Sequence, residues 1–332
     1  MNQVLIPTGF APPVPPRGLP LRQLQGATMG TTWSVRCATT IDPARLRAGI
    51  VAQLERVTAE MSGWRADSDL YRFNRLPAGA SLRLPEGFRR VLACALETAA
   101  ATDGAFDPTL GALVDLWGFG AQPAETEGPP PETRIAAARA CAGWRRIGFD
   151  AATGEAWQPG GLALDLSGIA KGFAVDLVAE WLLAAGVRDC LVEIGGELRG
   201  HGVKPDGSPW WVGIESPPGP RDASPPFVVA LHGLAMASSG EYRRCFHHAG
   251  RLYGHTLDPL SGQPIDNGIA AITVLHPSCM QADALATAFA VMGPAKALDH
   301  ARHRGIAALL VLRDGSGGRS EHVSPALAAM LD

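Results

Sequence analysis

The chain has 332 residues, of which 46% are hydrophobic and 18% are charged. This composition is typical of a globular protein, and the length suits one large domain or two small ones. The 29 basic and 32 acidic side chains give a formal net charge of −3. That balance argues against a nucleic-acid-binding protein, which needs a basic excess.

The N-terminal residues 1–25 are rich in proline and predict an arm ahead of the folded part. They contain no basic leader, no apolar signal-peptide core and no small-residue cleavage site, and no cysteine precedes Cys37. We therefore expect a cytoplasmic location. The cysteines are far apart and form no Cys-x-x-Cys motif, which predicts reduced, mostly buried thiols.

The first elements follow this arm. Residues 32–37 alternate in polarity and predict a strand. The pair Asp42-Pro43 predicts the start of a helix, because aspartate caps helices and proline fits the first turn. A second helix is expected from Pro85 to about Ala101. Residues 121–133 and 216–226 are rich in proline and predict exposed loops.

The second half of the chain mixes strands and helices. One helix is expected from about Ala170 to Ala185, and another should start near Asp283. Several consecutive strands between residues 209 and 236 argue against a pure βαβ repeat. We therefore predict an α+β fold with a mixed or antiparallel sheet flanked by helices. The strand-like runs are residues 161–166, 189–194, 209–215, 227–236, 269–276 and 307–312.

Common catalytic signatures are absent from the sequence. It contains no P-loop, no Gly-x-Ser-x-Gly, no Gly-x-Gly-x-x-Gly opening a helix and no His-Glu-x-x-His. Nucleotide-hydrolase, α/β-hydrolase, Rossmann and zincin interpretations therefore lose their main support. No uncharged apolar run is long enough to cross a bilayer. Three segments instead place polar groups in an apolar context.

The first segment runs from Leu162 to Asp176 and reads as a strand, a glycine turn and a helix. Free N–H groups at the helix start, together with Lys171, would form a seat for phosphate or for a carbonyl-rich ring. A structural turn with Lys171 in solvent explains the same pattern equally well.

The second segment carries Asp283 and Thr287, which lie four residues apart and so share one helix face. A carboxylate and a hydroxyl are hard oxygen ligands suited to Mg²⁺. The alternative is that Asp283 caps the helix and Thr287 bonds a turn carbonyl. For this segment alone the alternative is the better explanation.

The third segment places His255 ahead of the turn-forming pair Asp258-Pro259. Histidine is a suitable proton acceptor near neutral pH, although it could equally bond the turn backbone. Together, the three segments suggest a metal, a phosphate and a base in one protein. That combination indicates phosphoryl-type transfer.

A longer series of short motifs runs through the chain in a fixed order. The motifs are Met29-Gly30-Thr31-Thr32-Trp33, Met61-Ser62-Gly63-Trp64 followed by 68–74, then 104–109, 116–120, 165–171, 193–197, 239–243, 255–259 and 283–287. From about Gly26 to Ala297 the chain thereby resembles the ApbE family of Mg²⁺-dependent FAD:protein FMN transferases. The resemblance implies one domain of this family over residues 26–332.

The resemblance also implies a long pocket for FAD. Trp64 would stack on an aromatic ring system, although core packing is the commoner fate of a tryptophan. Asp165 would accept a hydrogen bond from a ring N–H, and Lys171 would pair with an anionic or carbonyl group. The residues implied to line the pocket are Met29, Trp64, Ala105, Phe106, Asp107, Asp165, Lys171 and Leu257.

The implied metal ligands are Asp283, Thr287 and the backbone carbonyl of Gly168. Mg²⁺ would bridge the two phosphates of FAD. A Ser or Thr hydroxyl of an acceptor flavoprotein would attack the phosphorus on the FMN side, and AMP would leave. His255 is the candidate base for the hydroxyl proton, and a metal-bound arrangement with Asp258 assisting is the alternative.

Two other functions use the same pocket. One is hydrolysis of FAD to FMN and AMP, with water as the nucleophile. The other is a flavin-binding module without turnover. A further alternative is a purely structural α+β domain without a binding or catalytic function. The expected partners are FAD and an acceptor flavoprotein with a Ser/Thr flavinylation motif, without nucleic acid and without a transmembrane segment.

Overall fold

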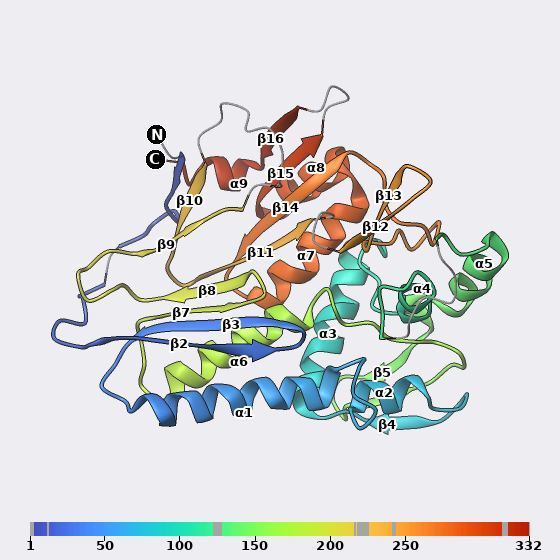
Figure 1. Ribbon diagram of the computed structural model, residues 1–332, viewed down its shortest axis with the longest axis horizontal. Helices are drawn as coiled ribbons and strands as arrows, with labels where there is room; N and C mark the ends of the chain where they lie inside the picture. Colours follow the sequence, from blue (N-terminus) through green and yellow to red (C-terminus); the bar gives the residue numbers. More distant parts are fainter. Residues whose placement is uncertain are drawn as a thin grey trace.

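A computed structural model describes residues 3–11, 13–121, 128–215, 217, 226–240, 244–313 and 318–331 (Figure 1). These residues form an α+β fold, as predicted. Its main sheet has eight strands within the described part, in the order β16-β15-β14-β11-β8-β7-β3-β2. All the neighbouring pairs of this sheet are antiparallel.

The bounds of the elements are as follows. The helices are α1 (Pro43–Met61), α2 (Asp69–Asn74), α3 (Glu86–Ala101), α4 (Gly111–Leu116), α5 (Glu132–Cys141), a 3₁₀ turn (Trp144–Arg146), α6 (Ala170–Ala184), α7 (Cys279–Met292), α8 (Pro294–Arg304) and α9 (Pro325–Ala328). The strands are β1 (Gln3–Leu5), β2 (Leu21–Thr28), β3 (Thr31–Ala38), β4 (Ser81–Arg83), β5 (Gly148–Asp150), β6 (Glu155–Trp157), β7 (Cys190–Ile194), β8 (Glu197–His201), β9 (Trp210–Gly213), β10 (Phe227–Leu231), β11 (Leu234–Gly240), β12 (Cys245–His248), β13 (Arg251–Gly254), β14 (Ile269–His276), β15 (Ala307–Arg313) and β16 (Arg319–Val323).

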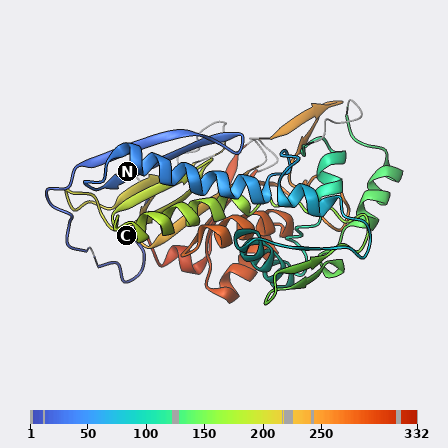
Figure 2. The same ribbon diagram turned by 90° about the horizontal axis from the view of Figure 1, so that it is seen from below.

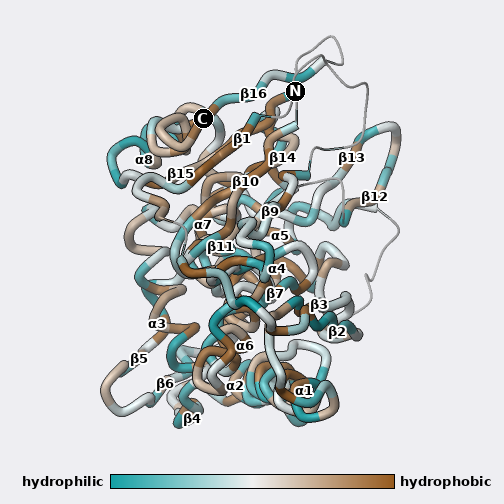
Figure 3. Tube along the Cα trace, turned by 90° about the vertical axis from the view of Figure 1, so that its left-hand side faces the viewer, coloured by the Kyte–Doolittle hydropathy of each residue, from teal (hydrophilic) through white to brown (hydrophobic). Residues whose placement is uncertain are grey.

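The main sheet is covered on both faces. Helices α1 and α6 lie side by side along one face (Figure 2), and the small sheet β1-β10-β9 packs on the other. Strand β7 supplies both cores, because successive side chains point to opposite faces. Val192 and Ile194 face the helices, whereas Leu191 faces the small sheet. The central strands β14 and β15 are strongly hydrophobic, and the edge strand β16 is largely hydrophilic (Figure 3).

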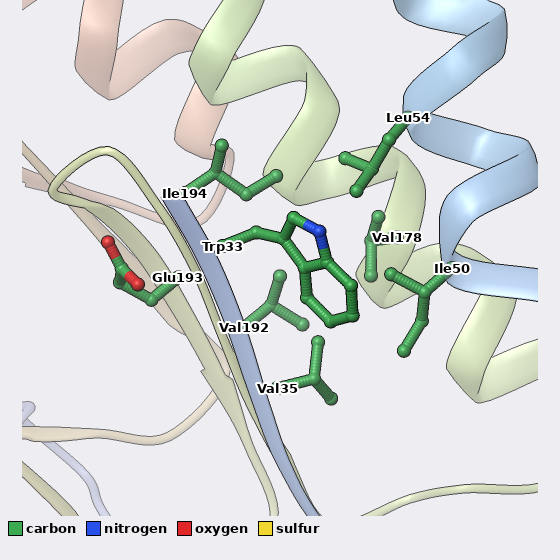
Figure 4. A pocket seen from close by; sticks show the side chains of 8 residues that line it. All are labelled: Trp33, Val35, Ile50, Leu54, Val178, Val192, Glu193 and Ile194. Atoms are coloured by element: carbon green, nitrogen blue, oxygen red, sulfur yellow. The ribbon is translucent and has the colours of Figure 1, made fainter. Parts of the chain in front are cut away.

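Trp33 marks the contact between the sheet and these helices. Its indole lies against Ile50 and Leu54 of α1 and Val178 of α6, while Glu193 of the neighbouring strand points away from the ring (Figure 4). The seam leaves no room for a water molecule. This is the close packing of a protein interior, and it fixes the sheet relative to α1 and α6.

Helices α6 and α7 approach each other closely at Gly172. A Cβ atom at this position would lie 2.3 Å from the carbonyl oxygen of Cys279 and 2.8 Å from Cβ of Asp283. Only glycine lets the two backbones come this near. The contact brings the first turn of α6 beside the part of α7 that carries Asp283.

A third hydrophobic cluster lies under α4, α5 and the β12–β13 hairpin, at the right of Figure 1. Leu113, Trp117, Ile135 and Leu257 are buried there. The indole Nε1 of Trp117 donates a hydrogen bond to the carbonyl oxygen of Gly262 at 2.9 Å. This bond ties α4 to the loop that follows β13, and so helps to place that loop.

Two expected elements differ from the structure. Residues 161–166 do not form a strand; a single isolated bridge joins Ala163 to Leu110. The side chain of Asn74 donates to the Leu164 carbonyl at 2.9 Å and accepts from the Leu164 amide at 2.8 Å, so a side chain replaces a neighbouring strand. The run 227–236 is two strands, β10 and β11, which belong to different sheets and are separated by Gly233 at φ 63°.

The expected helix near Asp283 begins earlier, at Cys279. Ser278 caps it, because its side chain accepts from the Gln281 amide. Asp283 therefore lies in the second turn and does not cap the helix. By contrast, the predicted cap Asp42 is confirmed, since its carboxylate accepts from the amides of Ala44 and Arg45.

The N-terminal segment packs on the protein, unlike the arm expected over residues 1–25. Strand β1 pairs with β10 in parallel, and Leu5 is fully buried. The Ile6 amide donates to the Met330 carbonyl at 2.7 Å. The expected boundary between residues 25 and 26 falls inside β2.

Several expectations concern segments that the structure describes only in part. Of the expected loops, residues 122–127, 216 and 218–225 lie outside the described residues. In the part of the chain that is described, no helix combines the length and apolarity needed to cross a membrane. The cysteines are free thiols, and Cys37, Cys94, Cys190 and Cys279 are buried.

Candidate active site

Two hairpin turns form one wall of the candidate site. The turn between β2 and β3 contains Met29 and Gly30 with φ of 46° and 70°, and the turn between β7 and β8 contains Gly195 and Gly196. The two turns are neighbours, because the Gly195 amide donates to the Thr32 carbonyl at 3.0 Å. The left-handed backbone of Met29 is unusual for a side-chain-bearing residue and is typical of functional turns.

The loop that leads into α6 forms the floor. The Asp165 amide donates to the Pro108 carbonyl at 2.8 Å, which joins this loop to the segment containing Ala105, Phe106 and Asp107. A Cβ atom built on Gly168 would lie 2.9 Å from Oγ1 of Thr287 and 3.5 Å from the Phe106 ring. Three segments far apart in the sequence therefore meet at Gly168.

Lys171, in the first turn of α6, pairs with Glu197 at the start of β8. Burial opposes the charged ammonium, but the carboxylates of Asp283 and Glu197 outweigh it and raise the pKa of Lys171. Burial raises the pKa of Glu197 to about 7, although Lys171 acts in the opposite direction. Within the described residues, Oε2 of Glu197 is buried without a hydrogen-bond partner. The Lys171 side chain is 32% exposed but ion-paired, so it is neither free in solvent nor fully buried.

Asp283 and Thr287 face this cluster from α7. Asp283 is 6% exposed, and its Oδ2 accepts a hydrogen bond from the Gly172 amide at 3.0 Å. Burial raises the pKa of the Asp283 carboxyl, and the charge of Lys171 opposes that rise. The Thr287 side chain is half-buried and its hydroxyl lies against Gly168.

This donor set suits a hard divalent cation. It offers one carboxylate, one hydroxyl and the nearby backbone of Gly168, which are the ligand types that Mg²⁺ prefers when it also keeps waters. The described residues contain no cluster of three His, Cys, Asp or Glu side chains that could hold a metal. A site here therefore needs further oxygen ligands from water or substrate.

His255 follows the end of β13. Its ring Nδ1 and its backbone amide both lie 3.1 Å from the carbonyl oxygen of Arg244. Because a carbonyl can only accept, Nδ1 carries the hydrogen and Nε2 keeps its lone pair. Burial lowers the pKa of His255 to about 4, and the positive charges of Arg244 and Lys171 add to that effect. The imidazole is therefore neutral near neutral pH.

Two site residues were missed by the sequence interpretation. Glu197 ends the quoted motif 193–197 but was given no role. Arg244 follows the motif 239–243, of which residues 241–243 lie outside the described residues. The charge of Arg244 lowers the pKa of Asp165, whereas burial, the larger effect, raises it. The Arg244 charge therefore lowers the pKa of both Asp165 and His255.

The other expected pocket residues lie in different surroundings. Trp64 is 61% exposed, which excludes core packing and leaves its ring free. The carboxylate of Asp107 is occupied by the Thr109 amide and hydroxyl and by the Trp144 amide. Leu257 is buried in the hydrophobic cluster under α4. Contact of these residues with FAD stays a prediction.

Known proteins resemble this chain over most of its length. The model of the ApbE family matches residues 29–310. A protein of Haemophilus influenzae named FAD:protein FMN transferase is 38% identical, covering 89% of this chain and 87% of its own. One of the same name from Vibrio cholerae is 37% identical, with 89% and 88% covered.

Solved structures are also similar to this chain over most of its length. The apo crystal structure of the Pseudomonas stutzeri flavinyl transferase ApbE has a TM-score of 0.87 and 40% identity, and 94% of this chain and 97% of that chain are covered. The flavin transferase ApbE from Vibrio cholerae has a TM-score of 0.85 and 34% identity, with 94% and 100% covered.

Proposed function

The chain belongs to the ApbE family, and from that membership we propose that it transfers FMN from FAD to a hydroxyl group of an acceptor protein. Relatives that are 38% and 37% identical carry the name FAD:protein FMN transferase. The observation that supports the proposal most directly is the meeting of Lys171, Asp283 and the loop at Gly168, together with a neutral His255 whose pKa the Lys171 charge helps to lower.

Each of these residues has a role that its surroundings allow. The ammonium of Lys171 binds a phosphate or carbonyl oxygen of FAD. Asp165 and the free ring of Trp64 orient the flavin. Nε2 of His255 accepts the proton of the attacking Ser or Thr hydroxyl, because Nδ1 is already donating to Arg244. AMP leaves as FMN becomes esterified to the acceptor.

Asp283, Thr287 and the Gly168 carbonyl would hold Mg²⁺. When bound, the ion supplies charge neutralisation at the phosphates of FAD. Burial of Asp283 next to Lys171 keeps the carboxylate in a dry environment, where its attraction for a cation is stronger than in water. The acceptor is proposed to be a flavoprotein with a Ser/Thr flavinylation motif, and the cytoplasmic location stays a prediction.

The test is mass spectrometry of an acceptor peptide incubated with the protein, FAD and Mg²⁺, with AMP measured in parallel. We expect a mass gain equal to esterified FMN, lost without the metal and lost in Asp283→Asn. Asp206→Asn is the control, since Asp206 is exposed and bonds only its own turn among the described residues.

The other outcomes identify other functions. AMP without a modified peptide would mean that the site hydrolyses FAD. Neither AMP nor a modified peptide would mean that the protein binds flavin without turnover. Full activity of Asp283→Asn would contradict the metal assignment.

A further inference from the structure

Lys171 has two carboxylates near it but pairs with one of them. Among the described residues, its ion pair is with Oε1 of Glu197. The charge of Asp283 acts on Lys171, yet their atoms do not come within ion-pair distance. The ammonium is therefore held on the β8 side of the site, away from α7.

The buried position of Glu197 at the start of β8 is unfavourable for the stability of the fold. Its side chain is 2% exposed, and the turn before it needs two glycines with φ of 62° and 104°. One oxygen holds Lys171, whereas the other is buried without a partner in the described part of the chain. Burial of an incompletely satisfied carboxylate is unfavourable for stability. Its presence therefore points to a role in the site.

We propose that Glu197 is a positioning residue that holds the Lys171 ammonium away from the Asp283 carboxylate and so leaves that carboxylate available to a divalent cation. An ammonium and a divalent cation compete for the same carboxylate oxygens. With Glu197 in place, the ammonium is paired on the β8 side, and the Asp283 carboxylate stays free of it for the cation. This inference rests on the metal role proposed above for Asp283.

The first test measures binding of Mn²⁺ alone, without FAD, from the electron paramagnetic resonance signal of the free ion. Glu197→Gln keeps the shape of the side chain but removes its charge, so Lys171 turns to Asp283. We expect Mn²⁺ to bind about tenfold more weakly than to the wild type, the change produced by one partly buried charge. Unchanged binding would overturn the proposal.

Glu193→Gln is the matched control. Glu193 lies in the same hairpin, but its carboxylate bonds the Ser34 hydroxyl and the Gly196 amide. Its side chain points away from the face of the sheet that packs on α6, the helix that carries Lys171 (Figure 4). We expect its Mn²⁺ affinity to stay within about twofold of the wild type. A loss as large as that of Glu197→Gln would overturn the specific role of Glu197.

The second test repeats Glu197→Gln in a Lys171→Met background. Without the ammonium there is nothing to hold away from Asp283, so the substitution should now weaken Mn²⁺ binding by no more than about twofold. An equal loss in both backgrounds would mean that Glu197 acts by its own charge, and would overturn the positioning role.

Two further comparisons complete the test. If Glu197→Gln does not fold, Glu197→Asp replaces it: the charge stays but the shorter side chain no longer reaches Lys171. Weaker Mn²⁺ binding is expected, and wild-type binding would overturn the proposal.

Asp283→Asn distinguishes failure of the metal assignment from failure of the positioning role of Glu197. If it binds Mn²⁺ as well as the wild type, the metal assignment fails, and this inference fails with it.

Discussion

His255 is held with a single ring nitrogen available for chemistry. The Arg244 carbonyl fixes the hydrogen on Nδ1, and burial with two nearby cations keeps the ring neutral. A neutral imidazole with a free Nε2 is the form that accepts a proton. The surroundings of the residue thus select its protonation state before any substrate binds.

The pH dependence of the reaction should reflect this low pKa. A histidine of ordinary pKa would lose its proton-accepting form below about pH 6.5, whereas burial lowers that of His255 to about 4. We therefore expect kcat/KM to show no histidine-dependent loss between pH 8 and pH 6. The measurement is a pH profile of AMP release in the wild type.

A fall to half of the maximum near pH 6.5 would contradict this prediction.

The same depressed pKa of His255 also affects the stability of the folded protein. Between pH 6.5 and 4 the unfolded chain binds a proton at His255 and the folded chain does not. His255 therefore makes the folded state less stable as the pH falls through this range, and has no such effect above it.

At this scale the sequence predicted part of the site. Spacing alone placed Asp283 and Thr287 on one helix face, because residues four apart in a helix are neighbours. Spacing could not predict the pair between Lys171 and Glu197, which joins a helix to a strand 26 residues away. Nor could it predict that the carboxylate of Asp107 is occupied both by Thr109 in its own turn and by the distant Trp144 amide.

The position of helix α7 depends on one buried carboxylate. Asp176 of α6 accepts hydrogen bonds from the Ser278 hydroxyl and from the amides of Cys279 and Met280. It also pairs with Arg199 of β8 at 2.7 Å. Asp176 therefore fixes the first turn of α7 against α6, and with it the two proposed metal ligands further along the helix.

Removal of this carboxylate should destabilise the whole element. We expect Asp176→Ala to lower the free energy of unfolding by about 3 kcal/mol, because it leaves the half-buried Arg199 and the first amides of α7 without their buried partner. Urea denaturation measures the change. Asp206→Ala, at an exposed turn, should stay within about 0.5 kcal/mol of the wild type.

A loss below about 1 kcal/mol for Asp176→Ala would show that α7 is held mainly by its apolar contacts.

The positions of the helices and strands were largely predictable from the sequence. The helix over residues 86–101 follows from the helical spacing of its apolar residues, and the strand over 269–276 follows from a continuous apolar run. The run 161–166 has the pattern of a strand, but side chains take the place of its neighbour, and no local pattern reveals that.

On the scale of the whole molecule, the first and last described segments close the structure together. Strand β1 adds to β10, and Leu5 forms a bridge with Leu331 beside α9. Leu5 also belongs to the apolar core on the face of the main sheet opposite α1 and α6. The N-terminal segment is thus part of the core, not an appendage.

Truncation of this one side chain should therefore be costly. We expect Leu5→Ala to lower the free energy of unfolding by about 3 kcal/mol, the usual result of emptying a buried leucine site. Val14→Ala is the control: Val14 lies in the same segment and is 89% exposed. Chemical denaturation checks both, and equal effects of the two substitutions would contradict the packed arrangement.

The fold class was predictable because consecutive strands without helices exclude a βαβ repeat. The order of the strands was not, since β3 pairs with β7 although helices α1 to α6 and strands β4 to β6 lie between them in the sequence. Ser34 and Glu193, which bond across these strands, are 159 residues apart. Pairings of this kind depend on the whole chain, and single-segment patterns carry no information about them.

The hydrogen bonds between Asn74 and Leu164 also influence the direction in which the Asp165 side chain points. In an extended chain, a slip of one residue exchanges the two faces. Leu162, Leu164 and Leu166 face inward, so Asp165 faces the other way, toward the site. The register of this segment is set by the Asn74 side chain 90 residues upstream, by the Gln158 side chain, which bonds Leu162, and by the backbone bond from Asp165 to Pro108. Asn74, far from Asp165 in the sequence, thus helps to set the side from which a ligand would meet its carboxylate.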